Sequence, residues 1–215
     1  MKEEIINLKY RQFHILEREL EAFPSMHRVA FAAACCERLY PHYDILLRIV
    51  REEGWDGEDL FRIALDEIWQ FLAGKKVDVA RFRQLYSDCD QSYPSYYENV
   101  DTPEGQRAAG AILYTLELCL APSVQQTISV VEEIHETLFE YIDYLRCESE
   151  DEYSEDISHE ELVEIVSNHP FTVREMAKQS EDLQHLQQTP TLTTELLQRL
   201  RTSSENGGKS LLNLS

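Results

Sequence analysis

Glycine and proline are scarce in this chain of 215 residues, which has seven of each. They fall between periodic segments, and no run alternates apolar and polar residues with the β-branched side chains that strands favour. This excludes a β fold. We predict an all-α, single-domain, multi-helix bundle of about eight to ten helices over residues 1–204. A flexible tail is expected over residues 205–215, although its leucines could dock as a short arm.

The sequence also lacks long hydrophobic runs and paired cysteines. The longest apolar run, residues 29–36, is far too short to span a membrane, and "MKEEIINLKY" is acidic where a signal peptide needs basic residues. The five cysteines are odd in number and contain no C-x-x-C pair. We therefore expect a cytoplasmic protein whose reduced thiols mostly behave as small buried apolar groups.

The chain has few positively charged residues: it contains 20 basic and 40 acidic residues, which gives a net charge of −20. Such a field repels nucleic acids and anionic membranes, so neither is expected as a partner. No lysine or arginine occurs between Arg146 and Arg174. This stretch is either a solvated loop and helix start or a surface that docks a basic protein. Its central acidic residues are Glu150, Asp151, Glu152, Glu155 and Asp156.

Sequence motifs of common catalytic sites are missing too. The chain has no phosphate-binding G-x-x-x-x-G-K-[ST], no dinucleotide G-x-G-x-x-G, no nucleophile elbow and no H-E-x-x-H. No cofactor is predicted.

Helical segments account for most of what is present. An apolar second helix is expected to start near Ser25, to lie in the middle of the bundle, and to stop or kink sharply at Pro41, which suits the start of a third. The full set of expected helices is about 2–21, 25–40, 41–53, 58–73, 78–88, 103–120, 123–147, 158–167, 170–188 and 191–202.

Two charged residues end the apolar helix, in "CCERLYPHY". Neighbours on a helix differ by about 100° in direction, so Cys35 and Cys36 point apart, and so do Glu37 and Arg38. Arg38 is either a buried structural clamp or a group that binds an anionic ligand. We take Glu37, Arg38, Tyr40 and His42 as candidates for a ligand-binding or structural polar cluster.

A weak metal motif, Glu132-x-x-His135, occurs in the longest predicted helix. Two such motifs build a di-iron site in a helical bundle, but here the second half is missing. The nearest match, Asp182-x-x-His185, directs its histidine away from the expected apolar stripe of Val173, Met176 and Leu183. No metal site is therefore predicted, and a hydrogen-bonded core histidine is the favoured interpretation of His135.

The segment "FAAACCERLYPHYDIL" resembles the signature of the bacterial YjaG-like family, domain of unknown function 416. Its members carry a similar F-x-x-x-x-C-E-R-hydrophobic-Y-P-x-Y block, which here runs from Phe31 to Tyr43. The segments "DEIWQFL", "AILYTLELCL", "TISVVEEIHETLFEYI" and "HPFTVREMAKQSEDLQHLQ" extend the resemblance along nearly the whole chain. It implies an all-helical single domain with no established activity, so no catalytic residue carries over.

The sequence leads to one favoured function and two alternatives. We favour a non-enzymatic protein-binding module, such as an inhibitor or immunity-type protein, whose acidic surface engages a basic partner. The first alternative is a metal- or small-ligand-binding enzyme with a polar site around Glu37, Arg38 and His135 between helices. The second is a structural homodimer.

Overall fold

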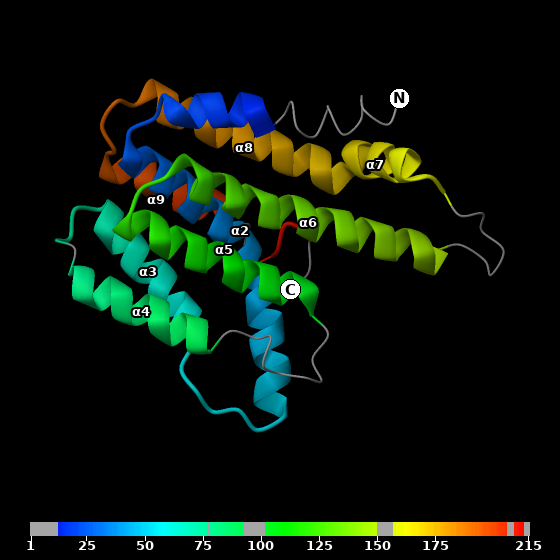
Figure 1. Cartoon of the computed structure of the whole chain (residues 1–215), viewed down its shortest axis with the longest axis horizontal. Helices are drawn as coiled ribbons and strands as arrows, with labels where there is room; N and C mark the ends of the chain where they lie inside the picture. The colour runs from blue at the N-terminus through cyan, green and yellow to red at the C-terminus, as the bar shows by residue number, and fades with distance from the viewer. Residues whose placement is uncertain (1–12, 77, 93–101, 150–156, 206–208, 213–215) are drawn as a thin grey trace.

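The fold was analysed in a computed structural model of the chain. It describes residues 13–76, 78–92, 102–149, 157–205 and 209–212. Every regular element in these ranges is a helix, as the scarcity of strand patterns predicted (Figure 1). A helical segment over residues 13–21 is followed by α2 (Ser25–Glu52), α3 (Leu60–Leu72), α4 (Val79–Gln91), α5 (Pro103–Leu120), α6 (Val124–Ser149), α7 (His159–Asn168), α8 (Pro170–Gln188) and α9 (Thr194–Ser204).

Helix α2 forms the middle of the bundle. All eight residues from Val29 to Cys36 are buried, which confirms the prediction from their apolar character. The helix packs against α3, α5, α6, α8 and α9. It also continues through Pro41 as one element, so the expected separate helix from residue 41 is wrong. Pro41 cannot donate to the carbonyl of Glu37, but burial of the surrounding side chains outweighs this single lost bond.

Helix starts follow the local signals of the sequence. Asp59 and Asp78 accept hydrogen bonds from the first turns of α3 and α4, while Ser158 and Glu161 form a complete capping box at α7. Prolines occupy the first positions of α5 and α8. These caps explain why most helix boundaries were predictable within a few residues.

Helix α8 turns a different face to the core from the one that its apolar stripe predicted. Its buried residues are Glu175, Gln179, Asp182 and Leu186, whereas Val173 of the expected apolar stripe is 55% exposed. A charged partner on α2 draws the polar side of α8 inwards, and this partner lies far away in the sequence.

The described part of the C-terminal tail lies against the bundle. Ser210, Leu211 and Leu212 are buried, and the backbone N–H of Leu211 donates to the carbonyl of Arg38 at 3.3 Å. Of the two expectations for the tail, the docked arm describes these residues.

No helix in the described ranges is both long and apolar enough to cross a membrane.

Candidate functional site

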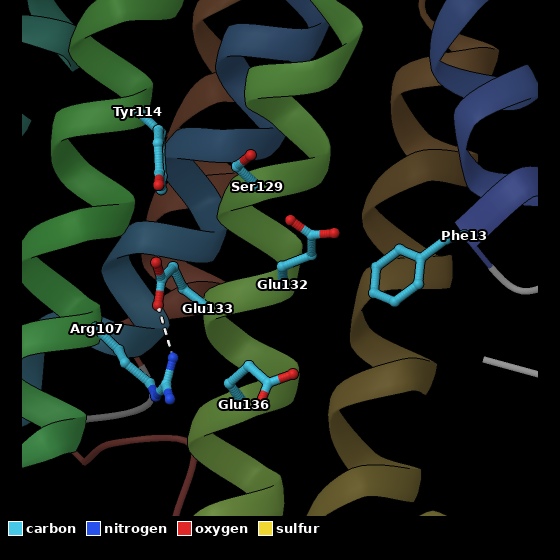
Figure 2. A pocket seen from close by; sticks show the side chains of 7 residues that line it. All are labelled: Phe13, Arg107, Tyr114, Ser129, Glu132, Glu133 and Glu136. Atoms are coloured by element: carbon cyan, nitrogen blue, oxygen red, sulfur yellow. Dashed lines mark hydrogen bonds and ion pairs between the residues drawn. The ribbon is translucent and has the colours of Figure 1, made fainter. Parts of the chain in front are cut away.

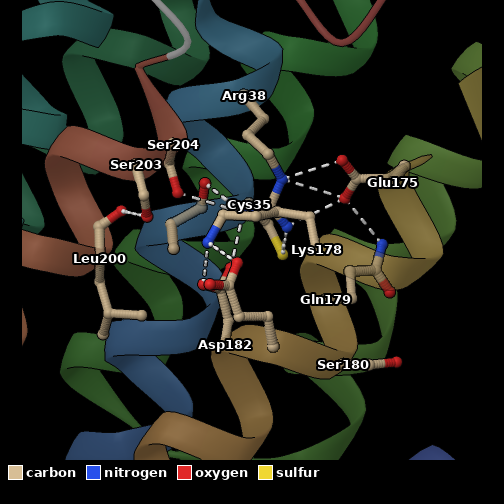
Figure 3. Close-up of polar contacts among 12 residues, drawn as sticks. Cys35, Arg38, Glu175, Lys178, Gln179, Ser180, Asp182, Leu200, Ser203 and Ser204 are labelled. Atoms are coloured by element: carbon tan, nitrogen blue, oxygen red, sulfur yellow. Dashed lines mark hydrogen bonds and ion pairs between the residues drawn. The ribbon is translucent and has the colours of Figure 1, made fainter.

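Arg38 lies at the centre of a buried polar cluster (Figure 3). Its Nε and Nη2 atoms donate to the carboxylate of Glu175 at 2.9–3.0 Å, and its Nη1 atom donates to Asp182 at 2.9 Å. Nη1 also donates to the hydroxyl of Ser204 and the carbonyl of Ala34. Burial alone lowers the pKa of Arg38, but the adjacent carboxylates more than offset this and leave the pKa above its ordinary value.

The acceptors of Arg38 have further partners of their own. Lys178 donates to Asp182, and Gln179 donates to Glu175 at 3.0 Å. Arg38 and Lys178 therefore balance Glu175 and Asp182 within a buried cluster, which we call the Arg38 cluster. A guanidinium with two carboxylates on its donors is a structural clamp, because those donors are already committed within the protein.

The vicinal thiols sit beside this cluster without the chemistry of a reactive pair. Burial raises the pKa of both, that of Cys36 to about 12, despite its hydrogen bond to Thr115. All five cysteines are free, and Cys35, Cys36 and Cys89 are buried, as expected for small apolar groups.

Glu37 faces a second cluster, on the other side of α2. Its carboxylate accepts two hydrogen bonds from Arg62 at 2.8 and 2.9 Å and one from the indole of Trp69 at 2.8 Å. Arg201 approaches the same carboxylate at 3.3 Å and also pairs with Asp66. Glu37 is thus bound by residues of α3 and α9, while Arg38 is bound by residues of α8 and α9.

The other two candidates, Tyr40 and His42, lie in different surroundings. Tyr40 donates to Asp59, and the guanidinium of Arg62 lies 4.7 Å from its ring, so Tyr40 belongs to the Glu37 side. His42 is buried, its Nε2 atom has no hydrogen-bond partner among the described residues, and burial lowers its pKa to about 4. The four candidates therefore do not converge on one site.

A groove that the sequence did not predict lies along α6 (Figure 2). Its cavity of about 280 Å³ is lined by residues of α5, α6 and the 13–21 helix: Phe13, Arg107, Tyr114, Ser129, Glu132, Glu133 and Glu136. We call it the α6 groove. Arg107 reaches across from α5 to Glu133 at 3.3 Å and to Glu140 at 3.0 Å. Burial raises the pKa of Glu133, even though Arg107 counteracts this effect.

The weak metal motif lies partly in this groove. Glu132 lines it, and the ring of His135 lies 5.1 Å from that of Phe13. Within the described residues, no group of three or more histidines, cysteines and acids has a geometry that could hold a metal ion.

A second cavity, of about 250 Å³ at the turn between α3 and α4, is lined by Phe71, Phe82, Glu67, Asp78, Lys75, Lys76 and Arg81. Neither cavity is lined by Glu37, Arg38, Tyr40, His42 or His135.

The acidic segment of residues 150–156 lies outside the described residues. The sequence missed the α6 groove because its carboxylates are spread along one helix and its lining cation, Arg107, comes from another. Spacing gave one hint: Glu132 and Glu136 are four residues apart and so share a face.

The helices, the two buried ionic clusters and the groove define an all-helical bundle with no recognisable catalytic constellation among its described residues. A family model described as "Protein of unknown function (DUF416)" matches residues 15–215. The chain belongs to this family. A crystal structure of a DUF416 family protein from Shewanella baltica OS155 has the same fold, with a TM-score of 0.76 and 20% sequence identity over 93% of this chain and 97% of that chain. None of the curated proteins matches the chain.

Proposed function

We propose that this protein is a non-enzymatic binding module whose α6 groove takes a basic side chain of a partner protein. The observation that carries the proposal is the pairing of Arg107 with Glu133 and Glu140 at the edge of the groove. A guanidinium from the protein's own α5 is already bound there. Glu132, an exposed carboxylate of the same groove, offers similar chemistry to an incoming arginine or lysine.

The charge of the whole molecule supports the same proposal. A net charge of −20 attracts a basic protein over distances of about 10 Å at moderate salt and accelerates its encounter with the groove. Aromatic rings of Phe13 and Tyr114 line the groove beside the carboxylates. Such rings supply apolar contact to the stem of a long basic side chain. An inhibitor or immunity-type role requires no more than such a binding surface.

The buried clusters favour this function over the enzymatic alternative. Glu37 and Arg38 are each bound by several partners within the protein and line neither of the two cavities. A substrate would have to displace these partners before it reached either group. The groove, in contrast, is lined by the exposed carboxylate of Glu132.

The test compares two variants with the same net charge. Glu132→Gln/Glu136→Gln neutralises the groove, and Glu52→Gln/Glu53→Gln neutralises two exposed residues at the end of α2. Proteins captured from lysate by the wild-type chain are identified, and the affinity of each purified basic candidate is measured by calorimetry at 50 and 200 mM NaCl. We expect a loss of about thirtyfold in affinity for the groove variant only. Each glutamine still accepts a hydrogen bond but loses the charge-assisted part, about 1 kcal/mol per bond and about 2 kcal/mol for the two.

A third variant examines the acidic segment. In it, Glu150, Asp151, Glu152, Glu155 and Asp156 are replaced by their amides. If this variant loses the partner and the groove variant keeps it, the partner binds the acidic segment and the groove proposal is wrong. Equal weakening by the groove variant and the Glu52/Glu53 control, with a larger loss in the third variant that removes five charges, would mean that only net charge matters. That result also contradicts a specific groove.

A further inference from the structure

The α7–α8 pair is held to the bundle in an unusual way. Three of the four buried residues of α8 are polar, namely Glu175, Gln179 and Asp182, and Val166 is the one residue of α7 classed as buried. Most other helices bury mainly apolar side chains, such as Phe61, Leu65 and Ile68 of α3. The attachment of α8 thus combines the Arg38 cluster with apolar contacts of Leu186 and, in part, of Phe171 and Leu183.

Ionic contacts of this kind are specific but add little net stability. Removing charged groups from water costs several kcal/mol per ion, which offsets most of the attraction between them. An element with few buried apolar contacts also opens locally at a lower free energy than the core does. A further contact that joins α8 to α2 would raise this opening free energy.

The C-terminal arm supplies this contact. Leu211 donates its backbone N–H to the carbonyl of Arg38 on α2 at 3.3 Å, and its own carbonyl accepts from Arg174 on α8. One residue thereby connects both helices. The side chains of Leu211 and Leu212 are 5% and 2% exposed, so the arm adds apolar burial to that of Leu186 on α8.

We propose that residues 210–212 form a strap that closes the α7–α8 pair over the Arg38 cluster, and that release of the strap lets this pair open as a unit while the rest of the bundle stays folded. The strap is a conformational device of the fold and does not depend on what binds the α6 groove. It places control of the Arg38 cluster in residues 210–212.

Hydrogen exchange of the full-length chain tests the strap. Leu211→Ala/Leu212→Ala removes its apolar contacts, and Val173→Ala serves as the matched control, because Val173 is an exposed apolar residue of α8. We expect amide exchange in residues 170–188 to accelerate about tenfold or more in the strap variant, with α2 and α5 unchanged. The control variant should exchange like the wild type.

Arg174→Gln gives a second and milder probe that leaves the arm itself intact. It removes the guanidinium that holds the carbonyl of Leu211, so exchange in α8 should rise by about threefold. Unchanged exchange in α8 of the strap variant would overturn the proposal. So would an equal rise in all helices, since the arm would then stabilise the whole fold rather than one helix pair.

Discussion

At the scale of single residues, the protein buries charged groups in its interior. Glu37 and Arg38 are neighbours in sequence, yet each faces a different group of helices and has its own set of opposite charges. The direction of the two side chains followed from helix geometry. Their partners did not, because Glu175 and Asp182 lie 137 and 144 positions from Arg38 and no local pattern encodes such a pairing.

His42 leads to a prediction about pH. Its pKa is lowered from 6.5 to about 4 by burial, so between these values the unfolded chain binds a proton that the folded chain does not. The contribution of neutral His42 to the free energy of unfolding is therefore fully present above pH 6.5 and is lost as the pH falls towards 4. The difference of about 2.5 pH units corresponds to roughly 3 kcal/mol.

The measurement is the free energy of unfolding in urea at several pH values from 7.5 to 4.5. Carboxylates titrate over part of this range in every variant, so the informative quantity is the difference between His42→Leu and the wild type. We expect the variant to lose less stability on acidification. His14→Gln, at an exposed histidine, should keep the wild-type slope. An unchanged slope in His42→Leu would mean that His42 does not control the acid response.

At the scale of helices, capping and proline positions made most boundaries predictable, and α5 and α8 start and end where expected. The inward face of α6 is apolar, with Ile128, Val131 and Leu138 buried. The orientation of α8 was wrong for a physical reason. Its apolar residues suggested one inward face, but pairing with a buried arginine turns the face of Glu175, Gln179 and Asp182 inwards and leaves Leu183 only half-buried.

The crossing of α2 and α5 gives the second prediction. A Cβ atom on Gly105 would lie 2.8 Å from the Cβ of Leu46 and 3.2 Å from the carbonyl oxygen of His42. Alanine is better than glycine in a helix by about 1 kcal/mol, but overpacking costs about 1–3 kcal/mol. Because the atoms in contact belong to or adjoin the backbone of α2, they cannot move aside without shifting the helix.

We therefore expect Gly105→Ala to lower the free energy of unfolding by about 1 kcal/mol, measured by urea denaturation followed by circular dichroism. The urea dependence of the free energy should stay unchanged, since the same surface becomes exposed on unfolding. A more stable variant would show that α2 and α5 separate easily, and that their close approach is not a constraint on the fold.

At the scale of the whole molecule, the excess of negative charge opposes compactness. Twenty uncompensated negative charges repel one another across the surface, whereas the Arg38 cluster is neutral within itself and shielded from solvent. The protein thus combines balanced charges inside with an unbalanced field outside. A surface of this kind is stabilised by anything that brings positive charge to it.

Salt provides the simplest test of this balance. The screening length falls from about 30 Å at 0.01 M to about 8 Å at 0.15 M, so self-repulsion weakens while the buried pairs are little affected. We expect the melting temperature to rise by about 3 °C over this range, which corresponds to about 1 kcal/mol for a chain of this length. Thermal unfolding in sodium chloride, repeated in choline chloride, separates general screening from sodium binding.

A fall in the melting temperature would mean that attractive surface ion pairs outweigh the repulsion. The α6 groove would then be part of a balanced surface, and the long-range attraction of a basic partner would lose its physical basis.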